Sequence, residues 1–383
     1  MRKILILAAV LCVTAGAQAQ QQYYRSRQHE NSWSENSHYC IRRPQPSRQQ
    51  LYVGVDFRTY FDNREYDGMG GFDISQTFFA AQITPKIGWQ WNSRNRLVFG
   101  AELERTFGDN SHFISEVQPL MYYRFMTPHV KALAGVFERE ELRMDAYPLA
   151  MMSDEMRFYE NRLQGLMGRY TSTAREDTFV ELSVDWCGIA TETTRERFRI
   201  LSAGRYTAGR FLFGYAFSMF HFAQTTHGGG VSDNLMAYPY VGTRFRAFFD
   251  FDIELGGIVA PQRIRSFDDG WKIPVGGQLK FAMSKWGVML ENTFYCGDGL
   301  MPYYWLYGSE FYAGERLWSA TKGVYNRTRL GYKRAFFDDT LEVEAFVLVH
   351  YDGVAAGTSQ QVKVNVKLEK LFGMNGANRN RRY

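Results

Sequence analysis

The feature of this sequence that most limits its fold is an alternation of apolar and polar residues with a period of two. From Val362 to Glu369, aliphatic residues occupy every second position, and Lys, Asn or Glu fills the positions between them. Because successive side chains of a strand point to opposite faces, this pattern predicts a strand with one apolar and one polar face. Similar segments follow Leu51 and lie near 81–92, 97–103, 116–127, 129–138, 163–172, 180–186, 195–205, 209–222, 241–255, 271–283, 285–296, 322–336 and 341–345.

The chain is aromatic and yet mildly polar. It contains 30 Phe, 24 Tyr and 8 Trp residues, and its mean hydropathy is −0.36. After residue 19, no segment approaches the roughly 18 apolar residues that a spanning helix needs, which excludes an α-helical membrane protein. A membrane barrel accounts for both properties, because only every second strand residue meets lipid. A soluble β-sandwich is the alternative, since its strands alternate too.

The predicted fold class is therefore all-β, a transmembrane antiparallel up-and-down barrel over residues 51–372. At roughly 20 to 22 residues per strand and turn, this length gives about 14 to 16 strands. The run 241–255 is longer than one membrane crossing, so we expect a tight turn near Phe248 to Asp250 and not a projecting strand. Residues 140–162 and 297–320 break the alternation and are predicted to be long loops on the outer side.

The N-terminus has the pattern of a secretory signal. Arg2 and Lys3 precede an apolar stretch, and Ala17-Gln18-Ala19 is typical of a cleavage site. Residues 1–19 are predicted to be removed, and residues 20–50, which are polar and nearly devoid of aliphatic side chains, to form a flexible arm. This arm is a linker or, alternatively, a plug or binding peptide. Residues 373–383 form a basic tail.

Several function classes receive no support from the composition. Without Arg2 and Lys3 the chain has 43 basic and 40 acidic residues, a near balance that does not favour nucleic-acid binding. Three cysteines remain after cleavage, Cys40, Cys187 and Cys296, and an odd number cannot pair completely within one chain. None belongs to a CxxC pair and the His residues are scattered, so no metal or cofactor is expected.

The signal peptide, the amphipathic strands of about ten residues and the alternation of short and long connections resemble the porin-like outer-membrane barrels of Gram-negative bacteria. The resemblance covers roughly residues 51–372 and rests on pattern. It implies outer-membrane localisation, contact with outer-membrane lipid and lipopolysaccharide, the barrel-assembly machinery as a partner, passage of small polar solutes and possible homo-oligomers. Such barrels commonly end on an aromatic residue, here Phe372 or Tyr383.

Charged residues recur on the polar faces of the predicted strands. A charge facing lipid at mid-depth costs about 2 to 4 kcal/mol for Arg or Lys, so these side chains are expected to face the lumen. They predict a pore wall with basic and acidic stripes, or alternatively a lumen closed by cross-strand ion pairs. The candidate pore-lining residues are Arg195, Arg197, Arg199, Arg244, Arg246, Asp250, Asp252, Glu254, Glu181, Asp185, Arg327, Arg329, Glu342 and Glu344.

We considered three functions: a porin-like channel for small polar or charged solutes, a non-conducting barrel that anchors partners through its loops, and an enzyme. The segment from His221 to Gln224 is faintly similar to the His-x-Ser-Asn signature of outer-membrane lipid A deacylases, in which His activates Ser. His221 has the register of the lipid side, but Ala223 stands where the nucleophile is required. We therefore expect a channel and no enzyme.

Overall fold

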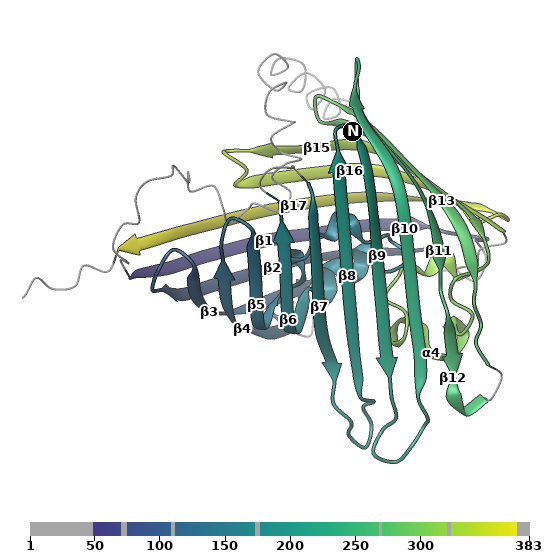
Figure 1. Ribbon diagram of the computed structural model, residues 1–383, viewed down its shortest axis with the longest axis horizontal. Coiled ribbons are helices and arrows are strands. Elements are labelled where there is room, and N and C mark those ends of the chain that lie inside the picture. The colour runs from purple at the N-terminus through teal and green to yellow at the C-terminus, as the bar shows by residue number, and fades with distance from the viewer. Residues whose placement is uncertain are drawn as a thin grey trace, which may run out of the picture.

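The computed structural model describes residues 49–69, 75–108, 112–172, 177–267, 270–319 and 323–373. Consecutive strands pair antiparallel, and β17 pairs with β1 to close the sheet. β11 and β12 both pair with β10 and form one interrupted strand, so the described residues build a closed barrel of 16 strands. This confirms the predicted all-β up-and-down barrel and excludes the sandwich (Figure 1).

The strands account for most of the described chain. They are β1 (Gln50–Glu65), β2 (Gln76–Gln90), β3 (Asn95–Thr106), β4 (Glu116–Met126), β5 (Val130–Glu138), β6 (Arg162–Thr171), β7 (Phe179–Gly188), β8 (Arg197–Ala208), β9 (Phe211–Phe222), β10 (Ser232–Arg246), β11 (Asp250–Val259), β12 (Gln262–Ile264), β13 (Val275–Lys285), β14 (Val288–Gly297), β15 (Gly323–Phe336), β16 (Leu341–Tyr351) and β17 (Ala356–Gly373). The turn predicted near Phe248 is confirmed, since β10 ends at Arg246 and β11 begins at Asp250.

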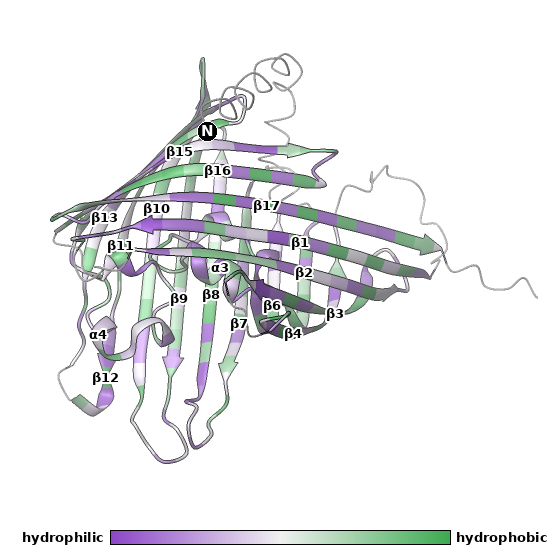
Figure 2. Ribbon diagram, turned by 180° about the vertical axis from the view of Figure 1, so that it is seen from behind, coloured by the Kyte–Doolittle hydropathy of each residue, from purple (hydrophilic) through white to green (hydrophobic). Residues whose placement is uncertain are grey.

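The period-two alternation becomes the two faces of the wall. In β1, Tyr52, Asp56 and Arg58 are buried, whereas Val53 and Phe57, at positions of the opposite parity, are exposed. Polar and apolar colours alternate along β1, β2 and β17 in Figure 2. The apolar face of each strand therefore lies outside, toward lipid, and the polar face lies inside. No helix in the described part of the chain is long and apolar enough to cross a membrane.

The connections define the two ends of the barrel. At one end, the connections are short between β2 and β3, between β8 and β9, and between β13 and β14. The ends of β1 and β17 that lead to the chain termini lie at this end too. Most connections at the opposite end are longer, and the β16–β17 turn is an exception. Because outer-membrane barrels have short periplasmic turns and longer extracellular loops, we call these the periplasmic and the outer end.

Three outer connections contain short helical segments in the described part of the chain; the one between β12 and β13 carries only η3 (Arg265–Phe267), and the other two are longer. The first, residues 139–161, carries η1 (Arg139–Glu141), η2 (Met144–Ala146) and α3 (Asp154–Tyr159). The second, residues 298–319, carries α4 (Tyr304–Tyr307), η4 (Gly308–Glu310) and η5 (Arg316–Trp318). Both coincide with the predicted long loops, and both fold into the lumen, which the sequence did not indicate. The predicted signal, most of the polar arm and nearly all of the basic tail lie outside the described residues.

Candidate functional site

Most of the predicted pore-lining residues face the lumen. Glu181, Asp185, Arg199, Glu254, Arg327, Glu342 and Glu344 are buried, and Arg197, Arg244, Asp250, Asp252 and Arg329 are partly buried. Many are joined by ion pairs. Arg329 contacts Glu291 and Glu344 at 3.0 Å each, and Nε of Arg244 contacts Asp252 at 2.8 Å. This is the cross-strand pairing of the alternative interpretation, and whether these residues line a conducting pore stays a prediction.

Two predicted residues are placed differently from the rest. The sequence pattern predicts Arg195 within a strand, but β8 begins at Arg197. Its guanidinium lies over the Phe222 ring, with the carbon at 4.8 Å from the centroid, and donates to the carbonyl of Ala223 at 3.0 Å, which holds it in the outer loops. Arg246 lies at the periplasmic end of β10, with 45% of its side chain exposed.

The first inward segment, residues 139–161, is tied to strands around the lumen by its first three residues. Arg139 donates to Asp185 of β7 at 2.8 Å, Glu140 pairs with Arg58 of β1 and with a lysine of β17, and Glu141 pairs with Lys131 of β5 at 2.5 Å. Burial alone would raise the pKa of Glu141, but the ammonium of Lys131 outweighs it and lowers the pKa to about 2. The segment is therefore a charged plug, fixed on opposite sides of the wall.

The plug also reaches the periplasmic half of the barrel. Asp145 contacts Arg205 of β8 at 3.1 Å, and Asp177, in the connection between β6 and β7, contacts the same Arg205 at 2.8 Å. Tyr147 donates to Glu181 near the periplasmic end of β7 at 3.0 Å. On this side of the lumen, plug residues thus reach from the outer end almost to the periplasmic turns.

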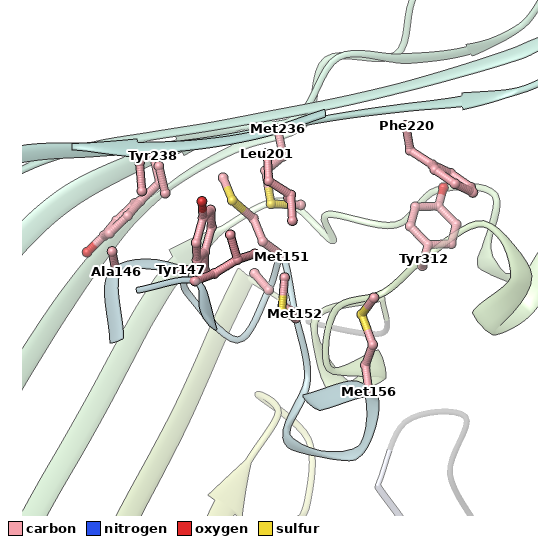
Figure 3. Close-up of a cluster of buried hydrophobic side chains, with 14 of the residues drawn as sticks. Ala146, Tyr147, Met151, Met152, Met156, Leu201, Phe220, Met236, Tyr238 and Tyr312 are labelled. Atoms are coloured by element: carbon pink, nitrogen blue, oxygen red, sulfur yellow. The ribbon is translucent and has the colours of Figure 1, made fainter. Parts of the chain in front are cut away.

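The second inward segment completes an apolar core inside the barrel. Its Ala313 accepts a hydrogen bond from the backbone N–H of Ser153, and its Glu315 donates from the backbone to Leu149, at 2.8 and 2.7 Å. Figure 3 shows Met151, Met152 and Met156 of the plug beside wall residues Leu201 and Met236 and beside Tyr312 of the second segment. The two segments therefore fill much of the outer half of the lumen with close-packed side chains.

In the periplasmic half, beside β11 to β17, several charged side chains of the wall are in contact with solvent. Inward-facing charged side chains there retain access to solvent, with 27% of Lys280, 28% of Glu291 and 23% of Lys333 exposed. Each of the three lies within an ion pair, to Glu254, Arg329 and Glu344 respectively. This region is a charged vestibule below the plug.

The barrel wall is notched at its outer end between β4 and β7. The β4–β5 pairing stops at Met121 and Val136, although β4 continues outward to Glu116. On the other side the β6–β7 pairing starts at Gly165 and Asp185, although β7 continues to Gly188. The chain leaves the wall after Glu138 to form the plug and returns at Arg162, so the wall is open above the β5–β6 hairpin.

Two glycines permit the chain to turn inward at this place. Gly135 and Gly165 pair with each other and have φ angles of 125° and 157°. A Cβ atom at Gly135 would lie 2.2 Å from the carbonyl oxygen of Met121, and one at Gly165 would lie 2.1 Å from that of Val184. Since only glycine adopts such backbone angles without strain, these residues determine where the notch forms.

The notch contains a cavity of about 370 Å³, lined by Glu116, Gln118, Pro119, Val136, Arg139, Glu160, Arg162, Gln164, Asp185, Trp186 and Cys187. Arg139 and Arg162 are 2% and 7% exposed. Nη1 of Arg139 and Nε of Arg162 are buried and have no hydrogen-bond partner among the described residues. An unsatisfied buried donor costs about 1 to 3 kcal/mol, and more on a charged group, so a ligand that brings acceptor atoms relieves this cost.

The mouth of the notch has a mixed character. Glu116 and Glu160 are exposed and can accept hydrogen bonds from a ligand, while Trp186 is 43% exposed on the lipid-facing side. Trp186 stacks on Phe198, which stacks on His221, with ring centroids 5.6 and 4.9 Å apart. These rings resemble the aromatic belt at a membrane interface. The notch thus offers polar groups at headgroup level and apolar groups beside it.

The chain belongs to the lipid A 3'-O-deacylase-type family, whose model matches residues 43–369. No curated protein matches it. Among solved structures, it is similar to an anion-selective porin from Comamonas acidovorans (12% identity, TM-score 0.48, covering 84% of this chain and 99% of that one). It is also similar to OprD from Pseudomonas aeruginosa (9% identity, TM-score 0.45, covering 84% and 94%). The part of the chain that the structure describes forms a closed antiparallel β-barrel.

The sequence interpretation missed the notch and its two arginines. Arg139 and Arg162 lie at the edges of the segment predicted to be a long loop, and only Asp185 of the notch was among the candidates. The available signal was the pair of glycines inside the two predicted strands that flank this loop, because a glycine within a strand often marks a bulge. The predicted outward position of His221 agrees with its ring stack.

Proposed function

We propose that this protein binds an acylated sugar lipid of the outer leaflet, of the lipid A type that its family name indicates, with the headgroup in the notch. The observation that carries the proposal is the pair of buried guanidinium groups, each with an unpaired N–H, in a cavity that opens through the wall. Ester, amide and phosphate oxygens are acceptors for these donors. Sugar hydroxyls are donors for Glu116 and Glu160.

The position of the notch supports a lipid ligand over a soluble one. Its mouth lies between the outer ends of β4 and β7, and exposed apolar side chains surround it, among them Val117, Leu166 and Trp186. A lipid of the outer leaflet can present its headgroup there while its chains stay in the bilayer. The proposal is one of binding, because Ala223 leaves the His221 segment without a serine nucleophile.

The test compares two arginine variants. Arg139→Gln should weaken binding of hexa-acylated lipid A, measured by native mass spectrometry of the mature protein, by about 10- to 100-fold, since a hydrogen bond to a charged group contributes about 1.5 to 3 kcal/mol. Arg205→Gln is the matched control, because it removes an equally buried guanidinium with two carboxylate partners away from the notch. Equal affinities of both variants would refute the proposal. Fatty-acid release by the wild type would add deacylation to binding.

A second candidate is a porin-like channel for small polar or charged solutes. The charged vestibule favours it, because Lys280, Glu291 and Lys333 keep side chains accessible to solvent inside the lumen. Passage requires the two inward segments to move, since they pack against the wall in the outer half. Ion conductance in a planar bilayer supports this candidate, and a silent bilayer favours the anchoring alternative. Contacts with lipopolysaccharide, with the assembly machinery and within an oligomer stay predictions.

A further inference from the structure

Four cationic side chains lie on the inner face of the wall near the periplasmic ends of β3 to β6, which run side by side (Figure 1). They are Arg96, Arg124, Lys131 and Arg169, one from each strand, and they are 5% to 7% exposed. We call them the basic cluster. Arg96 is directly opposite Arg124, and Lys131 is directly opposite Arg169. Since like charges directly opposite each other in a sheet are destabilising, the basic cluster requires negative partners.

Carboxylates neutralise only two of these four cations. Lys131 contacts Glu141 at 2.5 Å, and Arg169 contacts Glu181 at 3.6 Å. Glu141 also acts electrostatically on Arg124, but its carboxylate is in contact with Lys131 and forms no ion pair with the arginine. The two arginines of β3 and β4 are therefore left without a carboxylate partner among the described residues.

Arg124 is the least satisfied member of the basic cluster. Its side chain forms no hydrogen bond and no ion pair with any residue that the structure describes, and its Nε is buried without a partner. Arg96 beside it has uncharged partners. It donates to Oε1 of Gln90 at 3.0 and 2.8 Å, and its guanidinium lies over the Tyr52 ring, 4.1 Å from the centroid. Because a buried charge without a counter-charge is costly, this pair of guanidinium groups calls for an anion.

The pair lies at the periplasmic mouth of the lumen. Arg96 is the second residue of β3, directly after the short β2–β3 turn, and Arg124 is two residues from the end of β4. Tyr52, under the Arg96 guanidinium, donates to Oε1 of Glu369 at 2.7 Å, and Glu369 is exposed to solvent. A small solute that arrives from the periplasm therefore reaches this place without passing the plug.

We propose that Arg96 and Arg124 bind a phosphate group, either free or carried by a small solute. Guanidinium groups donate parallel N–H bonds to carboxylate and phosphate oxygens. A carboxylate has its two oxygens in one plane and satisfies one guanidinium, whereas a tetrahedral phosphate has oxygens in several directions and can bridge two guanidinium groups on neighbouring strands. The inference does not depend on the lipid binding proposed for the notch, since neither arginine lines that cavity.

The first experiment is urea unfolding of the mature protein, refolded in micelles, with and without inorganic phosphate at equal ionic strength. A ligand that binds only the folded protein raises the urea midpoint. Phosphate also stabilises proteins in general, because it is excluded from their surface. Each variant is therefore compared with the wild type in the same two buffers, and the difference between their phosphate responses reports the site.

Arg124→Met should have two opposite effects. Without phosphate it should unfold at a higher urea concentration than the wild type, because it removes an uncompensated buried charge. With phosphate it should lack the additional increase of the wild type. Arg205→Met is the matched control, because Arg205 is an equally buried arginine near the periplasmic end of β8 that has two carboxylate partners. It should unfold at a lower urea concentration in both buffers and keep the phosphate response.

The second experiment is equilibrium dialysis against radiolabelled inorganic phosphate. Arg124→Met should weaken phosphate binding by about 10- to 100-fold, the loss expected for a hydrogen bond to a charged group. Unlabelled glucose 6-phosphate and unlabelled inorganic phosphate then compete with the label. Displacement by both shows that the phosphate group of an ester is accepted, and displacement by inorganic phosphate alone shows that the ligand is the free ion.

Three results would overturn the inference. The first is an equal phosphate response of the wild type and Arg124→Met, or no retention of labelled phosphate by the wild type. The second is a lower urea midpoint of Arg124→Met without phosphate, which would show that the arginine stabilises the empty barrel. The third is displacement of the label by acetate at the same concentration as by phosphate, because the pair would then bind carboxylates.

Discussion

The ion pair between Glu141 and Lys131 should make a large and pH-dependent contribution to the stability of the plugged barrel. Glu141 belongs to the plug, and Lys131 to β5, with 20% and 7% of their side chains exposed. Glu141→Gln keeps the side-chain volume and removes the charge. The pKa of Glu141 falls from 4.5 to about 2 in the folded protein. This difference corresponds to about 3 kcal/mol at pH 7, at about 1.4 kcal/mol per pKa unit.

The sign of the pH dependence follows from the lowered pKa. An acid that is stronger in the folded than in the unfolded protein stabilises the fold above its unfolded pKa. The contribution of Glu141 is thus complete at pH 7 and is lost as the pH falls from about 4.5 to about 2. Wild-type stability should decline over this window more steeply than that of Glu141→Gln, and the two should converge at its acid end.

The assay is urea unfolding of the refolded protein in micelles, followed by tryptophan fluorescence from pH 7 down to about pH 2, the acid end of the window. The double variant Lys131→Met with Glu141→Gln is the control, because removing both partners of a buried pair costs less than removing one. A double-mutant cycle then isolates the pair from other effects of each substitution. The reasoning fails if the free energies of unfolding of Glu141→Gln and the wild type differ by less than about 0.5 kcal/mol at pH 7, which is about the usual error of additivity. It also fails if the stability of both proteins changes with pH to the same extent.

Two further predictions concern the wall and the lumen. Val364→Arg should block assembly, because Val364 faces lipid and a charge at mid-depth costs about 2 to 4 kcal/mol. Lys363→Gln, on the lumen side, should be tolerated. If both variants show the same heat-modifiable migration on gels, the two faces of the strand are assigned wrongly. If the protein conducts ions, replacing Arg197, Arg244 and Arg246 together with Gln should lower the permeability to anions relative to cations. The effect should be smaller in 1 M salt, where the screening length is about 3 Å. Unchanged ion selectivity in planar bilayers at low salt would contradict the basic stripe.

The sequence by itself determined the wall of this protein. The alternation in β17 places Val364 and Val366 outside and Lys363 and Lys367 inside, and the structure has this register, with the two lysines paired to plug carboxylates. Successive residues of a strand point to opposite faces, so the direction of a side chain depends only on its place along that strand. The inward direction of most charged residues follows from the same rule, whereas chain length limited the strand number only to about 14 to 16.

Only the tertiary structure decided what fills the lumen and where the wall opens. Residues 139–161 look like an ordinary outer loop in sequence, and their inward course depends on partners such as Arg58, Lys131 and Asp185, which lie on different strands. The notch likewise depends on β5 and β6 ending earlier than β4 and β7. Such features arise from contacts between residues far apart in the chain, and a period-two pattern contains no information about those contacts.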